Sequence, residues 1–400
     1  MKKILALVLA LAMLLSVAAV ASADYSGTVK IWVAEAAVDF TVAQVEAFKA
    51  AYPEYAGITV TVEPVGEGDA ASNMITDVEA GADIFGFAQD QLARLVAAGA
   101  VETVEENNAA VVEMENDAGA VAAVKVGDTM YAYPMTSDNG YFLYYDKSIV
   151  TDTSTVEAVL AQCEAAGKSF YFEINSGWYQ TAFFFGAGAN LTYDTNDDGA
   201  IVACNINYAS PEGLRALKSM IAVAASPAFM NGSSLSSATN VGAIVDGTWD
   251  AENAQALFGE NYAACKLPTV DGYQLGGFGG FKMLGVKPQT DEDKLGCCDA
   301  LAAWLTSGEV QLARFQALGW GPSNLAAQRN EAVQANVALA ALADQLQYCV
   351  PQGQYPGEYW GLATALGDDI LADKLDSMSD EELMTVLTNF QETAISYASK

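Results

Sequence analysis

The sequence predicts an α/β fold of two lobes, each a mostly parallel sheet flanked by helices, with a helical C-terminal part. Three observations support this fold class. Short apolar strands alternate with helices from Thr28 to Ala98, which is the pattern of βαβ units. A second α/β series follows without a low-complexity linker, and the chain after Asp291 is mostly helical. Because no single linker separates the two series, the lobes are expected to be joined by more than one crossing.

Six elements are predicted in order in the first series. The runs 28–33, 58–62 and 83–87 are apolar or alternating and predict strands. Helical spacing of apolar residues predicts helices between and after these strands, and Pro53, Gly81 and Gly99 end them. The predicted helices are 40–51, 69–80 and 89–98.

The second series is predicted from the same signals. Strands are expected at 131–134, 142–145, 169–174, 241–245 and 262–267, with helices at 155–165 and 211–225. The glycine-rich run 276–280 lacks the Lys-Ser/Thr ending of a phosphate loop. It is therefore interpreted as a flexible crossing between the lobes.

The first 23 residues are expected to be a secretory signal peptide. Lys2 and Lys3 form a cationic start, residues 4–15 are uninterruptedly apolar, and a small-x-small site ends at Ala23. We expect cleavage there and an extracellular or periplasmic protein, without membrane insertion after cleavage. The first cysteine is Cys163, so no lipoprotein cysteine is expected.

Charge and composition exclude several function classes. The formal net charge of −32 becomes −34 without Lys2 and Lys3, which disfavours nucleic acids and anionic membrane surfaces as partners. No cluster of Lys or Arg is visible that could bind an anionic ligand. The chain has no histidine, which excludes a His-based triad and an imidazole zinc site. We expect no cofactor and no metal.

Two further patterns leave alternatives open. The six cysteines allow either one or two disulfides or buried free thiols. Residues 194–199 match the first half of a calcium loop, but position 205 is Asn where the loop needs Glu. A solvated hairpin turn is the favoured interpretation, and calcium is the alternative.

Aromatic residues at the ends of predicted elements, several beside polar or acidic residues, indicate a sugar site. Flat rings cover the apolar faces of sugars, and carboxylates and amides bind the hydroxyls. The alternative, that these aromatics belong to the core, stays open, and it is the favoured interpretation for Trp304. The candidate ligand-binding residues are Trp32, Glu35, Phe87, Asp90, Asp138, Asn139, Trp178, Tyr179, Trp249, Asp250, Tyr359 and Trp360.

Ten segments in this order resemble the sugar-binding proteins of ABC importers, of the maltose-binding-protein type (family 1 solute-binding proteins). The likeness runs over essentially the whole mature chain. Each segment is weakly specific alone, whereas their joint order is specific. The segments are 27–33, 58–64, 81–90, 95–103, 131–135, 143–147, 175–179, 241–249, 267–269 and 358–360.

The resemblance implies a class II periplasmic-binding-protein fold whose lobes close over a sugar. It implies crossings near residues 136, 282 and 331. The first lobe is then 24–136 plus 282–330, and the second is 137–281 plus 331–400.

The resemblance also implies roles for individual residues. Trp249 and Trp360 resemble stacking residues, and Trp178 and Tyr179 resemble loop contacts, all in the second lobe. In the first lobe, Asp90 with Phe87 beside it resembles a hydroxyl acceptor. Asp138 or Asn139 would contribute from the strand after the first crossing.

The sequence departs from the family pattern in the first lobe. Phe87 stands where the family often has Trp, Gln91 where it has Arg, and residues 33–36 replace a polar run. These departures indicate a ligand different from maltose, or shorter contacts.

The function expected from sequence is a secreted, non-catalytic, monomeric receptor. It would bind a neutral mono- or oligosaccharide, maltose-like or maltooligosaccharide-like, and deliver it to the membrane subunits of an ABC importer. Two alternatives stay open: a secreted glycoside hydrolase, and a receptor of the same fold for a cation such as a polyamine.

Overall fold

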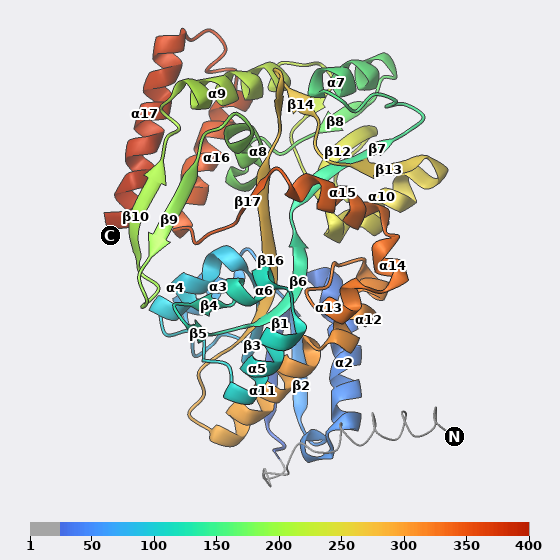
Figure 1. The fold of residues 1–400 in the computed structure, drawn as a ribbon, viewed down its shortest axis with the longest axis vertical. Helices are drawn as coiled ribbons and strands as arrows, with labels where there is room; N and C mark the ends of the chain where they lie inside the picture. Colours follow the sequence, from blue (N-terminus) through green and yellow to red (C-terminus); the bar gives the residue numbers. More distant parts are fainter. Residues whose placement is uncertain (1–24, 400) are drawn as a thin grey trace.

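The computed structural model describes residues 25–399, which form two lobes, each built on its own β-sheet (Figure 1). The predicted signal peptide, residues 1–23, lies outside the described residues. The predicted α/β class and two-lobed architecture are confirmed. Within residues 25–399, no helix combines the length and the apolar character that crossing a bilayer requires.

The first lobe, in the lower half of Figure 1, contains most of a six-stranded sheet, whose long strand β16 extends into the upper half and pairs there with β17. Its strands are β1 (Thr28–Val33), β2 (Thr59–Pro64), β3 (Ile84–Ala88), β6 (Tyr133–Asn139), β16 (Gly277–Val286) and β17 (Cys349–Pro351). The order is β17-β16-β3-β1-β2, and β6 also pairs with β16. Strand β1 is parallel to β2 and β3, whereas β16 is antiparallel to β3 and β6. The sheet is therefore mixed, and the chain reverses direction where β16 returns from the second lobe.

Helices and short turns surround this sheet. They are η1 (Glu35–Ala37), α2 (Val38–Ala51), η2 (Pro53–Tyr55), α3 (Ala70–Thr76), η3 (Gln89–Gln91), α4 (Leu92–Ala97), α5 (Glu106–Glu115), α6 (Ala118–Ala123), α11 (Glu292–Leu305), α12 (Gly308–Leu318), α13 (Leu325–Gln328) and α14 (Glu331–Gln334). A small hairpin joins β4 (Lys125–Val126) to β5 (Thr129–Met130).

The second lobe contains a five-stranded sheet of order β11-β8-β12-β7-β13. These strands are β7 (Tyr141–Asp146), β8 (Ser169–Tyr171), β11 (Phe229–Met230), β12 (Val241–Gly247) and β13 (Tyr262–Cys265). Its two hairpins are β9 (Leu191–Thr195) with β10 (Ile201–Ile206), and β14 (Thr269–Val270) with β15 (Tyr273–Gln274). Its helices and turns are α7 (Val156–Ala165), α8 (Gly177–Gly186), α9 (Pro211–Ala224), η4 (Thr248–Asp250), α10 (Ala251–Phe258), η5 (Gly259–Asn261), α15 (Val337–Leu346), α16 (Gly357–Leu371), α17 (Asp380–Ser396) and η6 (Tyr397–Ser399).

Each lobe has its own hydrophobic core. In the first lobe, Ile31 and Phe85 pack with Leu301, so residues beyond 282 complete a core that the N-terminal segment begins. In the second lobe, Leu143 and Phe390 belong to one core. Successive residues of a strand face opposite sides of its sheet, and accordingly Phe142 and Tyr144 lie in a smaller cluster separate from Leu143.

Strand β16 spans both lobes, with Phe278 in the second core and Leu284 in the first. Its first residues, Gly277–Gly279, pair with β17, and Lys282–Val286 pair with β3. The interpretation of residues 276–280 as flexible is therefore wrong, because most of this run is ordered strand. Glycine is required at Gly277, where φ is 141° and a Cβ atom would lie 2.6 Å from the Tyr141 hydroxyl.

Several predicted elements change in the structure. The helix predicted over 69–80 ends at Thr76, and the segment 89–98 divides into η3 and α4. Residues 194–199 form the tip of the β9–β10 hairpin, as predicted. All six cysteines are free thiols.

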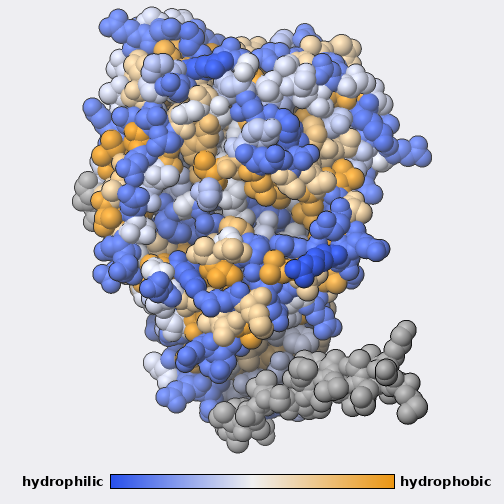
Figure 2. Space-filling view, viewed as in Figure 1, coloured by the Kyte–Doolittle hydropathy of each residue, from blue (hydrophilic) through white to orange (hydrophobic). Residues whose placement is uncertain are grey.

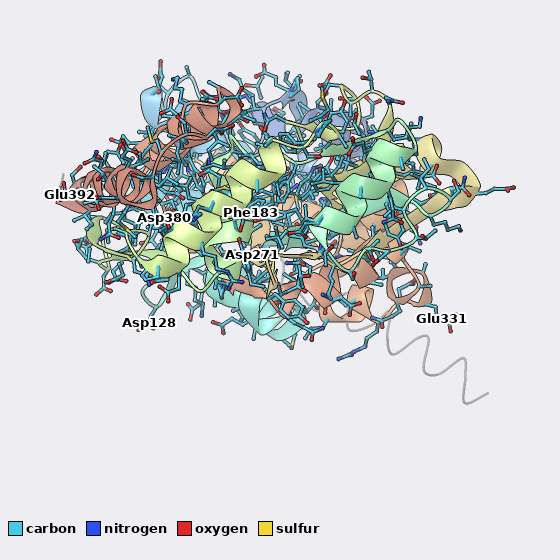
Figure 3. All side chains as sticks on the ribbon, turned by 90° about the horizontal axis from the view of Figure 1, so that it is seen from above. Asp128, Phe183, Asp271, Glu331, Asp380 and Glu392 are labelled. Carbon is cyan, nitrogen blue, oxygen red and sulfur yellow. The ribbon has the colours of Figure 1, made fainter. Side chains whose placement is uncertain are left out.

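The surface reflects the acidic composition. Figure 2 shows hydrophilic residues spread over both lobes, with hydrophobic residues mostly around the middle of this face. Seen from above, Glu392 and Glu331 lie at the periphery, whereas Phe183 lies among the helices of the second lobe (Figure 3).

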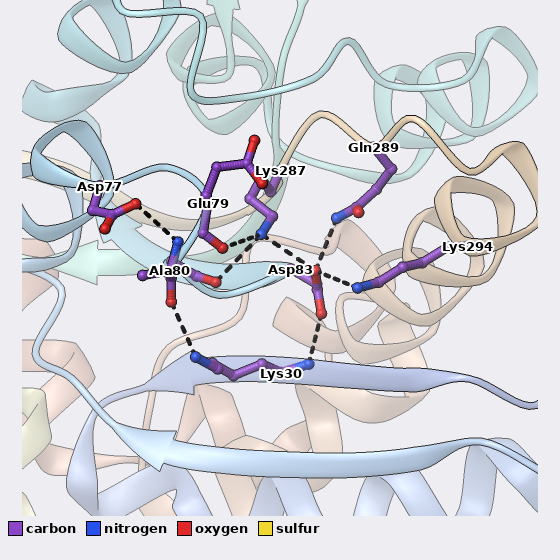
Figure 4. A network of polar contacts seen from close by, with 9 residues as sticks. Lys30, Asp77, Glu79, Ala80, Asp83, Lys287, Gln289 and Lys294 are labelled. Atoms are coloured by element: carbon purple, nitrogen blue, oxygen red, sulfur yellow. Dashed lines mark hydrogen bonds and ion pairs between the residues drawn. The ribbon is translucent and has the colours of Figure 1, made fainter.

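The first lobe contains a network of ion pairs and hydrogen bonds centred on the buried Asp83 (Figure 4). Asp83 accepts hydrogen bonds from the Lys30 backbone N–H at 2.9 Å and from Gln289 at 2.9 Å. Lys294 Nζ lies 2.8 Å and Lys287 Nζ 3.6 Å from Asp83 Oδ1. Burial favours the neutral acid, but the hydrogen bonds from Lys294, Lys30 and Gln289 outweigh it and lower the pKa of Asp83.

We expect Asp83→Asn to destabilise the protein by about 3 kcal/mol at pH 7, because it leaves the buried Lys287 and the half-buried Lys294 without their carboxylate. The lowered pKa gives the sign of the pH dependence. The ionised Asp83 contributes fully to the free energy of unfolding above the ordinary pKa of 3.8. This contribution is lost as the pH falls through the lowered pKa. Urea unfolding between pH 3 and 8 measures the difference in unfolding free energy between the wild type and Asp83→Asn. Asp128→Asn, at an exposed position, is the control. A difference that is the same at pH 3 and pH 8 contradicts the prediction.

Candidate functional site

A cavity of about 860 Å³ lies between the lobes and is lined by residues from both. The first lobe contributes the segments around Ala34, Glu67 and Asp90, and the second contributes the segments around Trp178 and Trp360. This volume falls within the range of small-molecule sites.

Four tryptophans line the cavity: Trp178, Trp249, Trp320 and Trp360. The chain has only six tryptophans, so this concentration marks the cavity as an aromatic site. The ring centroids of Trp178 and Trp249 are 5.9 Å apart with an interplanar angle of 48°. Trp178 Nε1 donates a hydrogen bond of 3.1 Å to Gln352 Oε1, which fixes the orientation of its ring.

Local structure explains where Trp249 lies. Strand β12 ends at Gly247, and the turn η4 places Trp249 directly after it. The indole packs over Gly247, since a Cβ atom at that position would lie 2.1 Å from the ring. A larger residue at position 247 would therefore displace the ring from the cavity.

The structure brings half of the predicted site residues together at the cavity. These residues are Asp90, Asn139, Trp178, Tyr179, Trp249 and Trp360. They come from the η3 turn, the end of β6, the start of α8, the η4 turn and the start of α16. Sequence segments far apart in the chain thus meet at one place, as the family resemblance implies.

Three predicted aromatic residues do not line the cavity. Phe87 is fully buried in the first core, because β3 is an interior strand covered on both faces. Tyr359 is buried in the second core beside Phe390, since helix geometry turns it away from its cavity-lining neighbour Trp360. Trp32 packs against the first core and donates a 2.9 Å hydrogen bond to Glu63, its register partner on β2.

Three predicted polar residues also do not line it. Asp138 is buried and accepts hydrogen bonds from Thr248 Oγ1 at 2.6 Å and the Gly321 N–H at 2.5 Å. Asp250 accepts from the Leu235 N–H at 2.8 Å, so both carboxylates hold backbone segments in place. Glu35 is exposed at the start of η1, and only its neighbours Ala34 and Ala36 reach the cavity.

Sequence reasoning missed several cavity residues. The unexpected charged residues are Glu67, Asp69, Arg94, Glu173 and Lys282, and the unexpected aromatic residue is Trp320. Two cationic side chains, Arg94 and Lys282, line the cavity together with four carboxyl groups, so it is not a basic pocket for an anionic ligand. Position 282 adjoins a predicted crossing, which is the one sequence signal that pointed to it.

Asp90 is a carboxyl group at the cavity wall whose pKa is strongly raised. It is 4% exposed, and burial raises its pKa to about 7, although the nearby Arg94 lowers it in part. Near neutral pH, this carboxyl group therefore exists in both protonation states.

We expect Asp90→Asn to stabilise the ligand-free protein, and to do so more at pH 8.5 than at pH 5. The raised pKa means that the neutral acid suits the fold, so the wild type loses stability as the pH rises from the ordinary pKa of 3.8 through about 7. Asparagine resembles the neutral acid and does not titrate, so its gain should grow by on the order of 2 kcal/mol between pH 5 and pH 8.5. Urea unfolding at both pH values measures it, and a gain at pH 5 equal to that at pH 8.5 contradicts the assignment.

This fold and cavity define a two-lobed binding protein with its site between the lobes. The chain belongs to the family of bacterial extracellular solute-binding proteins, whose family model matches residues 43–341. No curated protein sequence gives a significant match.

Solved structures share this fold over nearly the whole chain. One, described as a complex with acarbose, is 25% identical with a TM-score of 0.81, covering 92% of this chain and 98% of its own. The ligand-free maltodextrin-binding protein MalE1 of L. casei BL23 is 24% identical, with a TM-score of 0.76 and coverages of 94% and 100%. The GacH receptor of Streptomyces glaucescens is 17% identical, with a TM-score of 0.77 and coverages of 93% and 99%.

Proposed function

We propose that the protein is a receptor that binds a neutral oligosaccharide of the maltose type and delivers it to an ABC importer. The observation that carries the proposal is the cavity between the lobes, in which four tryptophans lie beside carboxylates and amides. Flat rings match the apolar faces of sugar rings, and the polar groups match their hydroxyls. The similarity to maltodextrin- and acarbose-binding structures supports the same ligand class.

Binding is proposed to work by hinge closure of two rigid lobes, 24–136 plus 282–330 and 137–281 plus 331–400. The hinge would lie where β6 leads to β7, where β16 returns, and near residue 331. A ligand that contacts both lobes favours the closed state by its differential affinity for that state.

The setting of the protein is part of the proposal. It would be exported by the signal peptide 1–23, act outside the cytoplasm as a monomer, and contact the membrane subunits of its importer. Neither nucleic acid nor a cofactor takes part in this function. Bond cleavage is not part of it either, in keeping with a family of binding proteins.

A thermal-shift screen followed by calorimetry tests the function. The ligands are maltose, maltotriose, maltotetraose and acarbose, with putrescine and spermidine as cationic competitors. A ligand that binds the native state raises the melting temperature, and we expect this for at least one saccharide and neither amine. A shift with the amines alone would favour the polyamine receptor. Release of reducing sugar from maltotetraose would favour the hydrolase.

A further inference from the structure

We propose that Glu67, Lys282 and Trp320 form a polar floor in the cavity that recognises one hydroxyl group of the ligand. This proposal rests on the proposed saccharide-binding function and deepens it. The three residues determine specificity, because together they select a neutral hydroxyl group over a charged group of either sign.

Lys282 is a buried ammonium held in place by aromatic rings. Its Nζ atom lies 4.9 Å from the ring centroid of Trp249 and 4.6 Å from that of Trp320. Cation–π contacts of this kind orient an ammonium without using its N–H donors. Within residues 25–399, Lys282 Nζ donates no hydrogen bond. Its one ion-pair partner, Glu67 Oε1, lies 4.0 Å away, which is beyond hydrogen-bond reach.

Two further polar atoms of these cavity residues have no hydrogen-bond partner in the described chain. Glu67 Oε1 and Trp320 Nε1 are both buried, and neither has a hydrogen-bond partner. Buried polar groups are nearly always hydrogen-bonded, because leaving one unpaired costs free energy. The Lys282 ammonium, the Glu67 carboxylate and the Trp320 N–H therefore form one set of groups ready to bind a polar ligand atom.

Their chemistry selects a hydroxyl group. An oxygen atom about 2.8 Å from each of two atoms fits a pair separated by 4.0 Å. A hydroxyl accepts a hydrogen bond from the Lys282 ammonium and donates one to the Glu67 carboxylate. A ligand carboxylate or phosphate would be repelled by Glu67, and a ligand ammonium by Lys282.

The positions of these residues in the fold support the same role. Glu67 precedes α3, Lys282 lies on β16, and Trp320 follows α12, so all three belong to the first-lobe side of the cavity. Trp249 reaches this floor from the second-lobe strand β12 and covers Lys282. Removing water from this ammonium strengthens its hydrogen bond to the ligand.

Calorimetry with deoxy sugars tests the proposal. The probe is the saccharide with the largest thermal shift among maltose, maltotriose, maltotetraose and acarbose, together with its monodeoxy analogues. We expect one analogue to bind the wild type at least tenfold more weakly than the parent sugar. In Lys282→Met and Glu67→Gln, the same analogue should bind less than about twofold more weakly than the parent sugar, because the hydroxyl group has then lost a hydrogen-bond partner.

Additional variants separate a direct contact from a structural effect. The double variant should lose no more affinity than the weaker-binding single variant, because both residues bind the same hydroxyl. Trp320→Phe keeps a ring but removes the N–H, and it should weaken binding of the parent sugar about threefold to tenfold. Lys282→Arg keeps the positive charge and the N–H donors. Its melting temperature, compared with that of Lys282→Met, shows whether loss of folded protein explains the weaker binding of Lys282→Met. Lys218→Met, on the outer face of the second lobe, is the control that should bind like the wild type.

Two different results would overturn the proposal. In the first, the wild type binds the parent sugar, but each monodeoxy analogue loses as much affinity in Lys282→Met and Glu67→Gln as in the wild type. The polar floor then does not bind a ligand hydroxyl group, whereas the proposed receptor function is retained. If the wild type binds no saccharide in calorimetry, the proposed function fails and this inference fails with it.

Discussion

Replacing Trp249 with alanine is expected to lower saccharide affinity tenfold or more. A buried stacked ring contributes about 1–3 kcal/mol, and about 1.4 kcal/mol corresponds to a factor of ten. The indole lies in the cavity 5.9 Å from the ring of Trp178 and also covers Lys282, so its loss removes a stacking surface and exposes a charge. Titration calorimetry with the parent sugar measures the change.

Trp304→Ala is the matched control for this substitution. Trp304 packs near Phe48 and Tyr52, and its Nε1 donates to the Gln44 carbonyl at 3.2 Å. It is therefore structural, as predicted, and its loss should reduce stability while affinity stays within about twofold. Unchanged affinity in Trp249→Ala would exclude Trp249 from ligand binding.

Gln311→Leu is expected to destabilise the first lobe by about 4 kcal/mol. The side chain is 1% exposed, and its Oε1 accepts hydrogen bonds from the Ser323 and Asn324 N–H groups at 2.7 and 2.9 Å. Its Nε2 donates to the Thr306 carbonyl at 2.8 Å. Leucine has a similar size but leaves these buried groups unpaired, at about 1–3 kcal/mol each.

Urea unfolding followed by fluorescence and circular dichroism measures the effect. Gln347→Leu, at an exposed position, should change stability by less than about 0.5 kcal/mol. If Gln311→Leu and Gln347→Leu lose similar amounts of unfolding free energy, the Gln-to-Leu replacement itself, and not the hydrogen-bond network of Gln311, accounts for the result. The segment held by Gln311 follows Trp320 directly, so weaker ligand binding should accompany the loss of stability.

The sequence predicts the architecture well because the fold depends on local patterns. Strands such as residues 28–33 and helices such as 211–225 appear where apolar periodicity and end signals place them. The strand Cys349–Pro351 lies in a segment predicted to be helical. It forms because its backbone pairs with Gly277–Gly279, a contact between distant segments that no local pattern encodes.

The site is predictable only in part, and the reason is side-chain direction. Adjacent residues such as Tyr359 and Trp360 have similar chemistry, yet one enters the core and the other lines the cavity. Along strand β6, Asp138 likewise points into the protein and binds Thr248, whereas the next residue, Asn139, lines the cavity. Glu67 and Lys282 were missed because a charged residue in a loop or strand carries no sign that tertiary structure will bury it.

The interleaved cores have a consequence for biogenesis. The first core needs Leu301 and the second needs Phe390, so neither half of the molecule can be completed while only the early part of the chain has been translated. A nascent chain of this kind keeps apolar segments exposed until synthesis is nearly finished. Such late completion leaves time for a chaperone to bind the polypeptide before it becomes compact.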